Sequence, residues 1–190
     1  MNELQKGIFE VILSILKCEY IFDNEITDNS KKRKLIDHGS IRYGLLNYVA
    51  KYSLANDKYF ITNKAFKYLK ANDLLNKNEE LRRGKKKSVN SKTKKKYQFT
   101  YEHPVPSNVI SDYLVIHRKD DENIKKILNI TDAVTVLTDE EDAELSKNKL
   151  IDKMPPDWDI FEGDIFERYK ATKTIEIPNK KINVYGAIKR

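Results

Sequence analysis

The residues of this sequence best suited to chemistry are an acid and a histidine at the end of a strand pattern. Glu102 and His103 follow residues 96–102 (KYQFTYE), in which aromatic residues alternate with polar ones as in a β-strand. Pro104 and Pro106 restrict the backbone that follows and hold His103 in one orientation. A carboxylate can bind a hard cation while an imidazole takes a proton from water. The pair is therefore a candidate for metal-assisted hydrolysis, and the alternative is a structural histidine at a strand end.

The element Glu102-His103-Pro104-Val105-Pro106 resembles the Asp/Glu-His-x-x-Pro signature that opens the HNH, or ββα-metal, nuclease motif. In that family a β-hairpin precedes a helix, the histidine activates water, and the preceding acid ligates the metal. Residues 134–137 and the following TDEED are similar to the family's second strand and helix start. The resemblance implies a general base at His103 and oxygen ligands for Mg²⁺ or Mn²⁺ at Glu102 and Asp142.

Positive charge is concentrated in one stretch of the chain. Nine basic residues and no acidic one lie in what we call the basic segment, residues 82–96: Arg82, Arg83, Lys85, Lys86, Lys87, Lys92, Lys94, Lys95 and Lys96. Removing these nine from the net charge of +7 leaves −2 for the rest of the chain. A phosphate backbone is the natural partner of such a segment, and a solvated loop is the alternative. The seven lysines are therefore predicted to bind nucleic acid, through its backbone because no aromatic residue lies among them.

Two further charged features have ordinary interpretations. Arg168 could clamp a phosphate with two hydrogen bonds, but an arginine in this setting more often pairs with carboxylates, and we expect the pairing. The acidic run at residues 139–144 suits the first turn of a helix without any metal, because the helix dipole favours negative charge there. Within that run only Asp142 is a metal-ligand candidate.

Composition narrows the class of protein. The 190 residues include 39% hydrophobic and 34% charged residues, enough apolar area for a packed core. No stretch approaches the roughly 20 apolar residues of a membrane span, and no secretory signal is visible, so we expect a cytoplasmic protein without a membrane partner. The single cysteine, Cys18, excludes an internal disulfide and a zinc site of several thiolates. The sequence has no Gly-rich phosphate loop, which argues against ATP- or NAD-dependent chemistry.

The elements that must position these residues follow from periodicity and capping signals. Helices are expected at residues 3–22, 40–54, 62 to about 76, 107–114, 121–128, 138–145 and 164–169. Strands are expected at residues 96–102, 133–137, 174–177 and 182–185. Ser107 is expected to cap its helix, and Thr138 with Glu141 matches a capping box.

Together the elements predict an α+β protein. Residues 1–80 form a helical portion that positions the duplex, residues 81–96 a basic connecting segment, and residues 97–190 a small β-containing, ββα-metal-like portion. The first three helices suit a small bundle or a helix-turn-helix variant, and a plain helical subdomain suits them equally well.

The leading functional prediction is a metal-dependent endonuclease acting on double-stranded DNA, of the kind found in restriction systems or mobile elements. A palindromic site would favour a homodimer. One alternative is a non-enzymatic DNA-binding regulator that uses the basic segment as an arm on the backbone. Another is a toxin-like RNase or a phage-encoded interaction protein.

Overall fold

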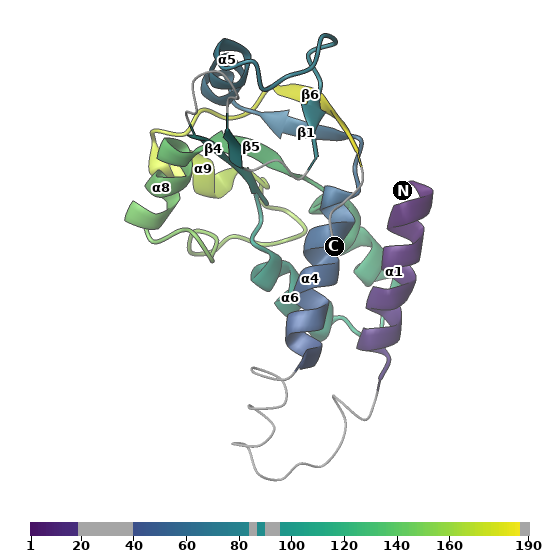
Figure 1. The fold of residues 1–190 in the computed structure, drawn as a ribbon. Helices are drawn as coiled ribbons and strands as arrows, with labels where there is room; N and C mark the ends of the chain where they lie inside the picture. The colour runs from purple at the N-terminus through teal and green to yellow at the C-terminus, as the bar shows by residue number, and fades with distance from the viewer. Residues whose placement is uncertain (19–39, 84–86, 90–95, 187–190) are drawn as a thin grey trace.

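The computed structural model describes residues 1–18, 40–83, 87–89 and 96–186. These residues form a mixed sheet with helices on both faces and a group of longer helices at one end (Figure 1). The expected α+β class is confirmed, with a helical start and strands toward the C-terminus. No helix in these ranges is long and apolar enough to cross a membrane.

Four helices pack together below the sheet in the view of Figure 1: α1 (Glu3–Leu16), α4 (Ser40–Leu54), α6 (Ser107–Ile116) and α7 (Asp121–Ile130). Their facing sides bury one apolar cluster, which includes Ile12, Val49 and Leu114. Burial of these side chains, each worth about 1.5–3 kcal/mol, holds the four helices together although they come from distant parts of the chain.

The sheet contains six strands in the order β2-β6-β1-β5-β4-β3. The strands are β1 (Lys58–Ile61), β2 (Leu81–Arg82), β3 (Lys87–Val89), β4 (Lys96–Glu102), β5 (Thr135–Thr138) and β6 (Lys180–Tyr185). β1 runs parallel to β5 and β2 parallel to β6, while the other neighbours are antiparallel. The Tyr101 hydroxyl of β4 donates to the Arg82 carbonyl of β2 at 3.0 Å, so the sheet curls until these two strands approach each other.

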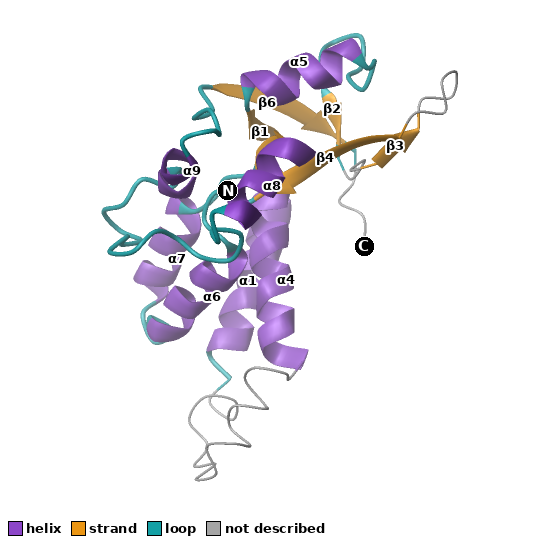
Figure 2. Cartoon of the chain, turned by 90° about the vertical axis from the view of Figure 1, so that its left-hand side faces the viewer, coloured by secondary structure: helices purple, strands orange, loops and turns teal. Residues whose placement is uncertain are grey.

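The two faces of the sheet are covered differently. Helix α5 (Asn63–Ala71) covers one face, where its Leu69 packs with Tyr59, Tyr101 and Val184 of the strands. On the other face, α8 (Asp139–Lys147) and α9 (Glu167–Thr172) lie against β4 and β5 and bury Leu137. Figure 2 shows α5 above the sheet and α8 and α9 on its other side.

The turn from β5 into α8 has the hydrogen bonds expected of a capping box. Thr138 accepts from the Glu141 N–H at 3.3 Å, and the Glu141 carboxylate accepts from the Thr138 N–H at 2.9 Å. The Thr62 hydroxyl, which caps α5, also donates to Glu141 at 3.0 Å. The buried Glu141 carboxylate therefore joins the starts of two helices on opposite sides of the sheet.

One structural expectation for residues 1–80 is wrong. Strand β1 lies between α4 and α5, and α5 packs on the sheet rather than against α1 and α4, so the three helices form neither a small bundle nor a helix-turn-helix. The four residues Lys58–Ile61 follow the turn at Asn56 and Asp57 and are too few to distinguish a strand from a helix flank by periodicity. Tertiary pairing with β5 and β6 decides their conformation.

Smaller differences lie at element boundaries. The last helix begins at Glu167 instead of residue 164, and residues 174–177 form no strand. Pro106 occupies the N-cap position of α6 without a side-chain hydrogen bond, so Ser107 is the first helical residue and not the cap. Parts of the expected basic connecting segment, in β2 and β3, belong to the sheet. The first helix ends at Leu16, with Lys17 as its C-cap, rather than continuing to residue 22; residues 19–22 lie outside the described ranges.

Candidate functional site

The Glu102–His103 element lies where the sequence placed it, at the end of β4. Glu102 is opposite Thr135 of the antiparallel strand β5. After His103, the buried residues Pro104, Val105 and Pro106 lead directly into α6. Helices α6 and α7 lie between β4 and its antiparallel partner β5 in the chain, so the two strands are not a simple hairpin; α8 follows β5 directly and packs on both strands.

A buried arginine organises this strand end. The Arg168 side chain is fully buried and makes an ion pair with the Glu102 carboxylate. Its guanidinium also donates to four backbone carbonyl oxygens, those of His103, Pro104, Leu150 and Ile151. The bonds to Pro104 and Leu150 measure 2.7 and 2.8 Å. We call this cluster the Arg168 junction; it ties the end of β4 to the segment after α8.

The charges of the junction compensate each other. Burial lowers the pKa of Arg168 to about 10, so the guanidinium remains cationic at neutral pH. Glu102 is 16% exposed and supplies the opposite charge. The expected carboxylate pairing of Arg168 is thus confirmed, with an acid 66 residues away in the chain.

This pairing does not suit Glu102 as a metal ligand. A divalent cation at the Glu102 carboxylate would lie next to the buried guanidinium, and two positive charges in a region of low dielectric repel strongly. In the described part of the chain, no group of three His, Cys, Asp or Glu side chains could hold a metal ion. The residues here therefore do not fit the implied Mg²⁺ or Mn²⁺, and we derive no step through a metal.

Asp142 is partly buried in the first turn of α8. Its charge acts on the buried Tyr169 hydroxyl: desolvation is the largest cause that raises the pKa of Tyr169 to about 12, and Asp142 adds to it. Its neighbour Glu140 is paired with Lys64 at 2.6 Å. The structure thus places Asp142 on the helix that packs against β4, but does not join it with Glu102 and His103 into a three-residue metal group.

Most of the predicted nucleic-acid-binding lysines lie outside the described residues: Lys85, Lys86, Lys92, Lys94 and Lys95. Lys87 begins β3 and Lys96 begins β4, and these strands pair with Val89 opposite Lys96. Figure 2 shows β3 and the start of β4 extending from one edge of the sheet. The two ends of the lysine-rich stretch are therefore held side by side by backbone hydrogen bonds.

A second basic surface, which the sequence alone does not reveal, lies on the part of the sheet that α8 and α9 leave uncovered. Five exposed residues share it, because paired and alternate residues point to the same side: Lys58, Arg82, Lys181, Asn183 and Tyr185. We call this surface the open face. Its residues come from three separate stretches of the chain, and the exposed positions of KKINVY, alternating with buried ones, were the one local signal for it.

The cations of the open face differ from other surface lysines of the protein. Many of those lysines neutralise an acid, as in the Lys17–Asp121 pair at 2.5 Å and the Lys70–Glu79 pair at 2.6 Å. Among the described residues, by contrast, no ion pair or hydrogen bond engages the side chains of Lys58 and Arg82. The Lys181 ammonium lies 4.4 Å from the centre of the Phe60 ring. Within the described ranges, the open face therefore carries cations that no ion pair neutralises, although the Asp132 carboxylate acts on Lys181 from a distance.

A buried carboxylate borders the open face. Asp132 accepts hydrogen bonds from Gln5 at 2.9 Å and from Asn56 at 2.6 Å. Burial raises the pKa of Asp132 despite these two bonds. The amides belong to α1 and to the turn before β1, so the network joins the helical group to the sheet beside Lys58 and Lys181. A pocket of about 380 Å³, lined by Gln5, Asn56, Asp132, Lys58 and Lys181 among others, lies at this point.

Comparison with known proteins identifies no relative. No protein-family model, no curated protein and no solved structure matches this chain. The arrangement of the residues themselves must therefore support any functional conclusion.

Proposed function

We propose that this protein binds nucleic acid through the open face together with the basic segment. The observation that carries the proposal is the gathering of Lys58, Arg82 and Lys181 on one exposed sheet surface, where no ion pair engages their side chains among the described residues. Arg82 is both a member of this surface and the first residue of the basic segment, so the two cationic features are continuous in the chain. Cations that lack protein partners are free to replace the counterions of a phosphate backbone.

The Arg168 junction favours nucleic-acid binding over metal-dependent catalysis as the proposed function. The Arg168 guanidinium is enclosed and bonded at every nitrogen, so it offers nothing to a phosphate. Glu102 is committed to that guanidinium. The charged groups at the end of β4 therefore have a structural explanation, whereas those of the open face have none within the described protein.

Binding is tested by fluorescence anisotropy with labelled duplex DNA, single-stranded DNA and RNA over a range of salt concentrations. For duplex DNA, log K should fall linearly with log salt, with a slope of about −0.9 for each phosphate contacted. Substituting Lys58, Lys181 and Arg82 by Gln should make that slope shallower by about 2 to 3 if each contacts one phosphate.

The matched control removes the same charge elsewhere. Lys125, Lys149 and Lys153 are exposed and lie on α7 and in the segment after α8, away from the open face. Their triple substitution by Gln should leave the salt slope nearly unchanged. If both triple variants made the salt slope shallower by the same amount, only net charge would matter, and the assignment of binding to the open face would be overturned.

A second candidate function is phosphodiester hydrolysis with His103 as general base, which the packing of α8 on β4 and β5 favours. Incubating the protein with supercoiled DNA in Mg²⁺, in Mn²⁺ and in chelator tests it. Under this hypothesis His103→Ala abolishes strand breaks while retaining binding, and His117→Ala, at the end of α6 against the Phe161 ring, serves as the control. Intact DNA under every condition would remove the candidate and leave the binding proposal standing.

A further inference from the structure

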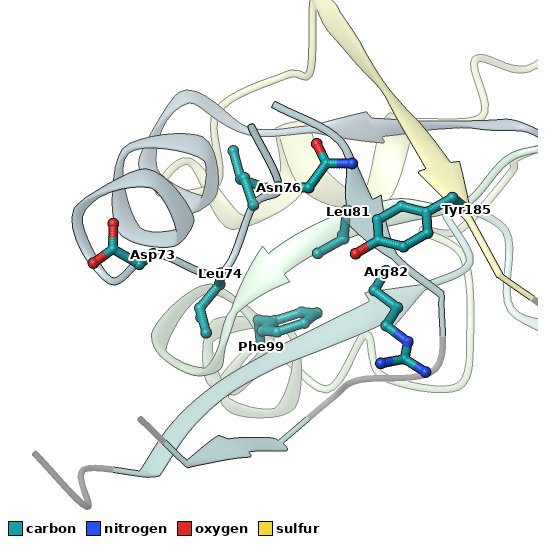
Figure 3. Close-up of a pocket in the computed structure, with 8 residues that line it drawn as sticks. Asp73, Leu74, Asn76, Leu81, Arg82, Phe99 and Tyr185 are labelled. Atoms are coloured by element: carbon teal, nitrogen blue, oxygen red, sulfur yellow. The ribbon is translucent and has the colours of Figure 1, made fainter. Parts of the chain in front are cut away.

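A small hollow lies beside β2, on the side away from β6, and borders the open face. Its volume is about 150 Å³, and its lining combines Leu74, Leu75, Leu81 and Phe99 with the polar residues Asp73, Asn76, Arg82 and Tyr185. Figure 3 shows the Phe99 ring below Leu81 and the Tyr185 ring beside it, with the Tyr185 hydroxyl directed toward Leu81. The hollow thus has an apolar floor and a polar rim.

Two polar side chains of this rim are available to a ligand. Among the residues that the structure describes, no hydrogen bond or ion pair engages the side chains of Arg82 or Tyr185, whereas the Asp73 carboxylate is directed away from the hollow (Figure 3). Tyr185 is 40% exposed although it is a large aromatic residue. Asn76 differs, because its amide is used within its own turn by Glu80 and by the N–H of Asn78.

The size and chemistry of the hollow suit one planar heterocycle. A volume of 150 Å³ equals about five water molecules at ~30 Å³ each, which is room for a flat ring system and not for a folded segment of chain. Unstacked bases are held by aromatic rings and by arginine guanidinium planes, while hydrogen-bonding groups contact their edges. Tyr185 and Arg82 supply such surfaces at the rim, and the buried Phe99 ring lies beneath them as the apolar floor.

The position of the hollow connects it with the phosphate-binding surface. Arg82 and Tyr185 are paired residues of β2 and β6, and both belong to the open face. We propose that the hollow holds one unpaired base of a nucleic-acid strand whose phosphates lie along the open face. This inference rests on the proposed nucleic-acid binding and adds that the preferred partner contains an unpaired base.

The test uses the full-length protein with a single-stranded oligonucleotide that carries one 2-aminopurine, and with a fully paired duplex. Bound to the wild type, the 2-aminopurine should be protected from quenching by acrylamide. Tyr185→Ala should remove that protection and weaken single-strand binding about tenfold, the typical loss of one stacked base. Because a duplex offers no unpaired base, the same substitution should weaken duplex binding by a smaller factor. Tyr43→Ala, which removes a 71% exposed tyrosine from α4, should change neither value.

Each outcome separates the two proposals. Failure of the wild type to bind any nucleic acid contradicts the proposed function itself. Binding that is equally strong for single strands and duplexes, with no effect of Tyr185→Ala or of Arg82→Gln on quenching, overturns the base-binding hollow and leaves the proposed function intact. Circular dichroism of both variants shows whether they fold, and a folded Arg82→Gln variant keeps the test valid if Tyr185→Ala does not fold.

Discussion

The Arg168 junction and the open face use positive charge in opposite ways. At the junction a buried guanidinium is surrounded by a carboxylate and four carbonyl oxygens, so its charge is matched within the protein. On the open face, Lys58 and Arg82 are exposed and have no such partners among the described residues. A charge removed from water must be compensated by the fold, whereas an exposed charge can remain for a partner.

The difference predicts which property each region controls. Substitutions at the junction should change stability and leave nucleic-acid binding nearly unchanged. Substitutions in the basic regions should change binding and leave stability nearly unchanged.

Arg168→Ala should have the largest effect, a loss of about 3–5 kcal/mol, because it leaves the partly buried Glu102 and several carbonyl oxygens without their donor. Urea unfolding followed by circular dichroism measures it. Arg168→Lys keeps the charge but not the planar guanidinium, so its free energy of unfolding should lie between those of the wild type and of Arg168→Ala. Lys67→Ala, at an exposed position of α5, is the control. A loss below about 1 kcal/mol for Arg168→Ala would contradict the structural role of the junction.

Glu102→Gln should cost about 2 kcal/mol, because a neutral amide replaces the carboxylate that accepts from the Arg168 guanidinium. Thermal unfolding with and without Mg²⁺ also tests the metal-ligand prediction. A ligand that binds the folded state raises its melting temperature. We expect no such rise for the wild type; a rise that Glu102→Gln removes would restore Glu102 as a metal ligand.

Thr138→Ala should cost about 1 kcal/mol, the usual value of a helix cap, because the Glu141 N–H loses its acceptor. Urea unfolding provides the measurement. Thr138→Ser keeps the hydroxyl and should restore most of the stability. If both variants lost equal stability, packing of the threonine methyl group rather than capping would be responsible.

Asp132 should make stability depend on pH with a defined sign. Burial raises the pKa of Asp132 in the folded protein, so its contribution is fully present below the pKa of the unfolded chain and is lost as pH rises through the higher folded value. The free energy of unfolding of the wild type, relative to the Asp132→Asn variant, should therefore fall as pH rises above about 4, the pKa of an aspartate in the unfolded chain. Urea unfolding at several pH values measures it, and a difference that rises with pH would refute the assignment.

Substituting Lys92, Lys94 and Lys95 by Gln should change the free energy of unfolding least, by less than about 0.5 kcal/mol. The salt slope of duplex binding should nevertheless become shallower by about 0.9 for each phosphate that these lysines neutralise in the wild type. A large loss of stability with unchanged binding would contradict this assignment, because the basic segment would then act like the Arg168 junction.

Local signals accounted for much of the secondary structure. The expected bounds of α4 and β4 are those observed, and the capping box of α8 is present with both of its hydrogen bonds. Such features depend on residues within about four positions of one another, so a single sequence contains their full pattern. Strand β1 was missed because four residues carry too little periodicity, and its pairing partners are far away in the chain.

The candidate site was predictable only in part. The sequence identified Glu102 and His103 at a strand end, the basic segment, and the tendency of Arg168 to pair with a carboxylate. It did not indicate that the carboxylate would be Glu102 itself, which changes the interpretation of that residue from metal ligand to ion-pair partner. The open face gave no motif, because its members occupy residues 58, 82 and 181–185.

By itself the sequence determined the α+β composition, most helices, the aromatic strand and the position of the concentrated charge, because these follow from spacing along the chain. Tertiary structure alone decided which charges are buried with partners and which remain exposed. Arg168 meets Glu102, and Arg82 lies beside Tyr185, through sheet pairing and helix packing over long sequence separations. The energetic meaning of a charge depends on its neighbours and its access to water, and both are properties of the folded chain.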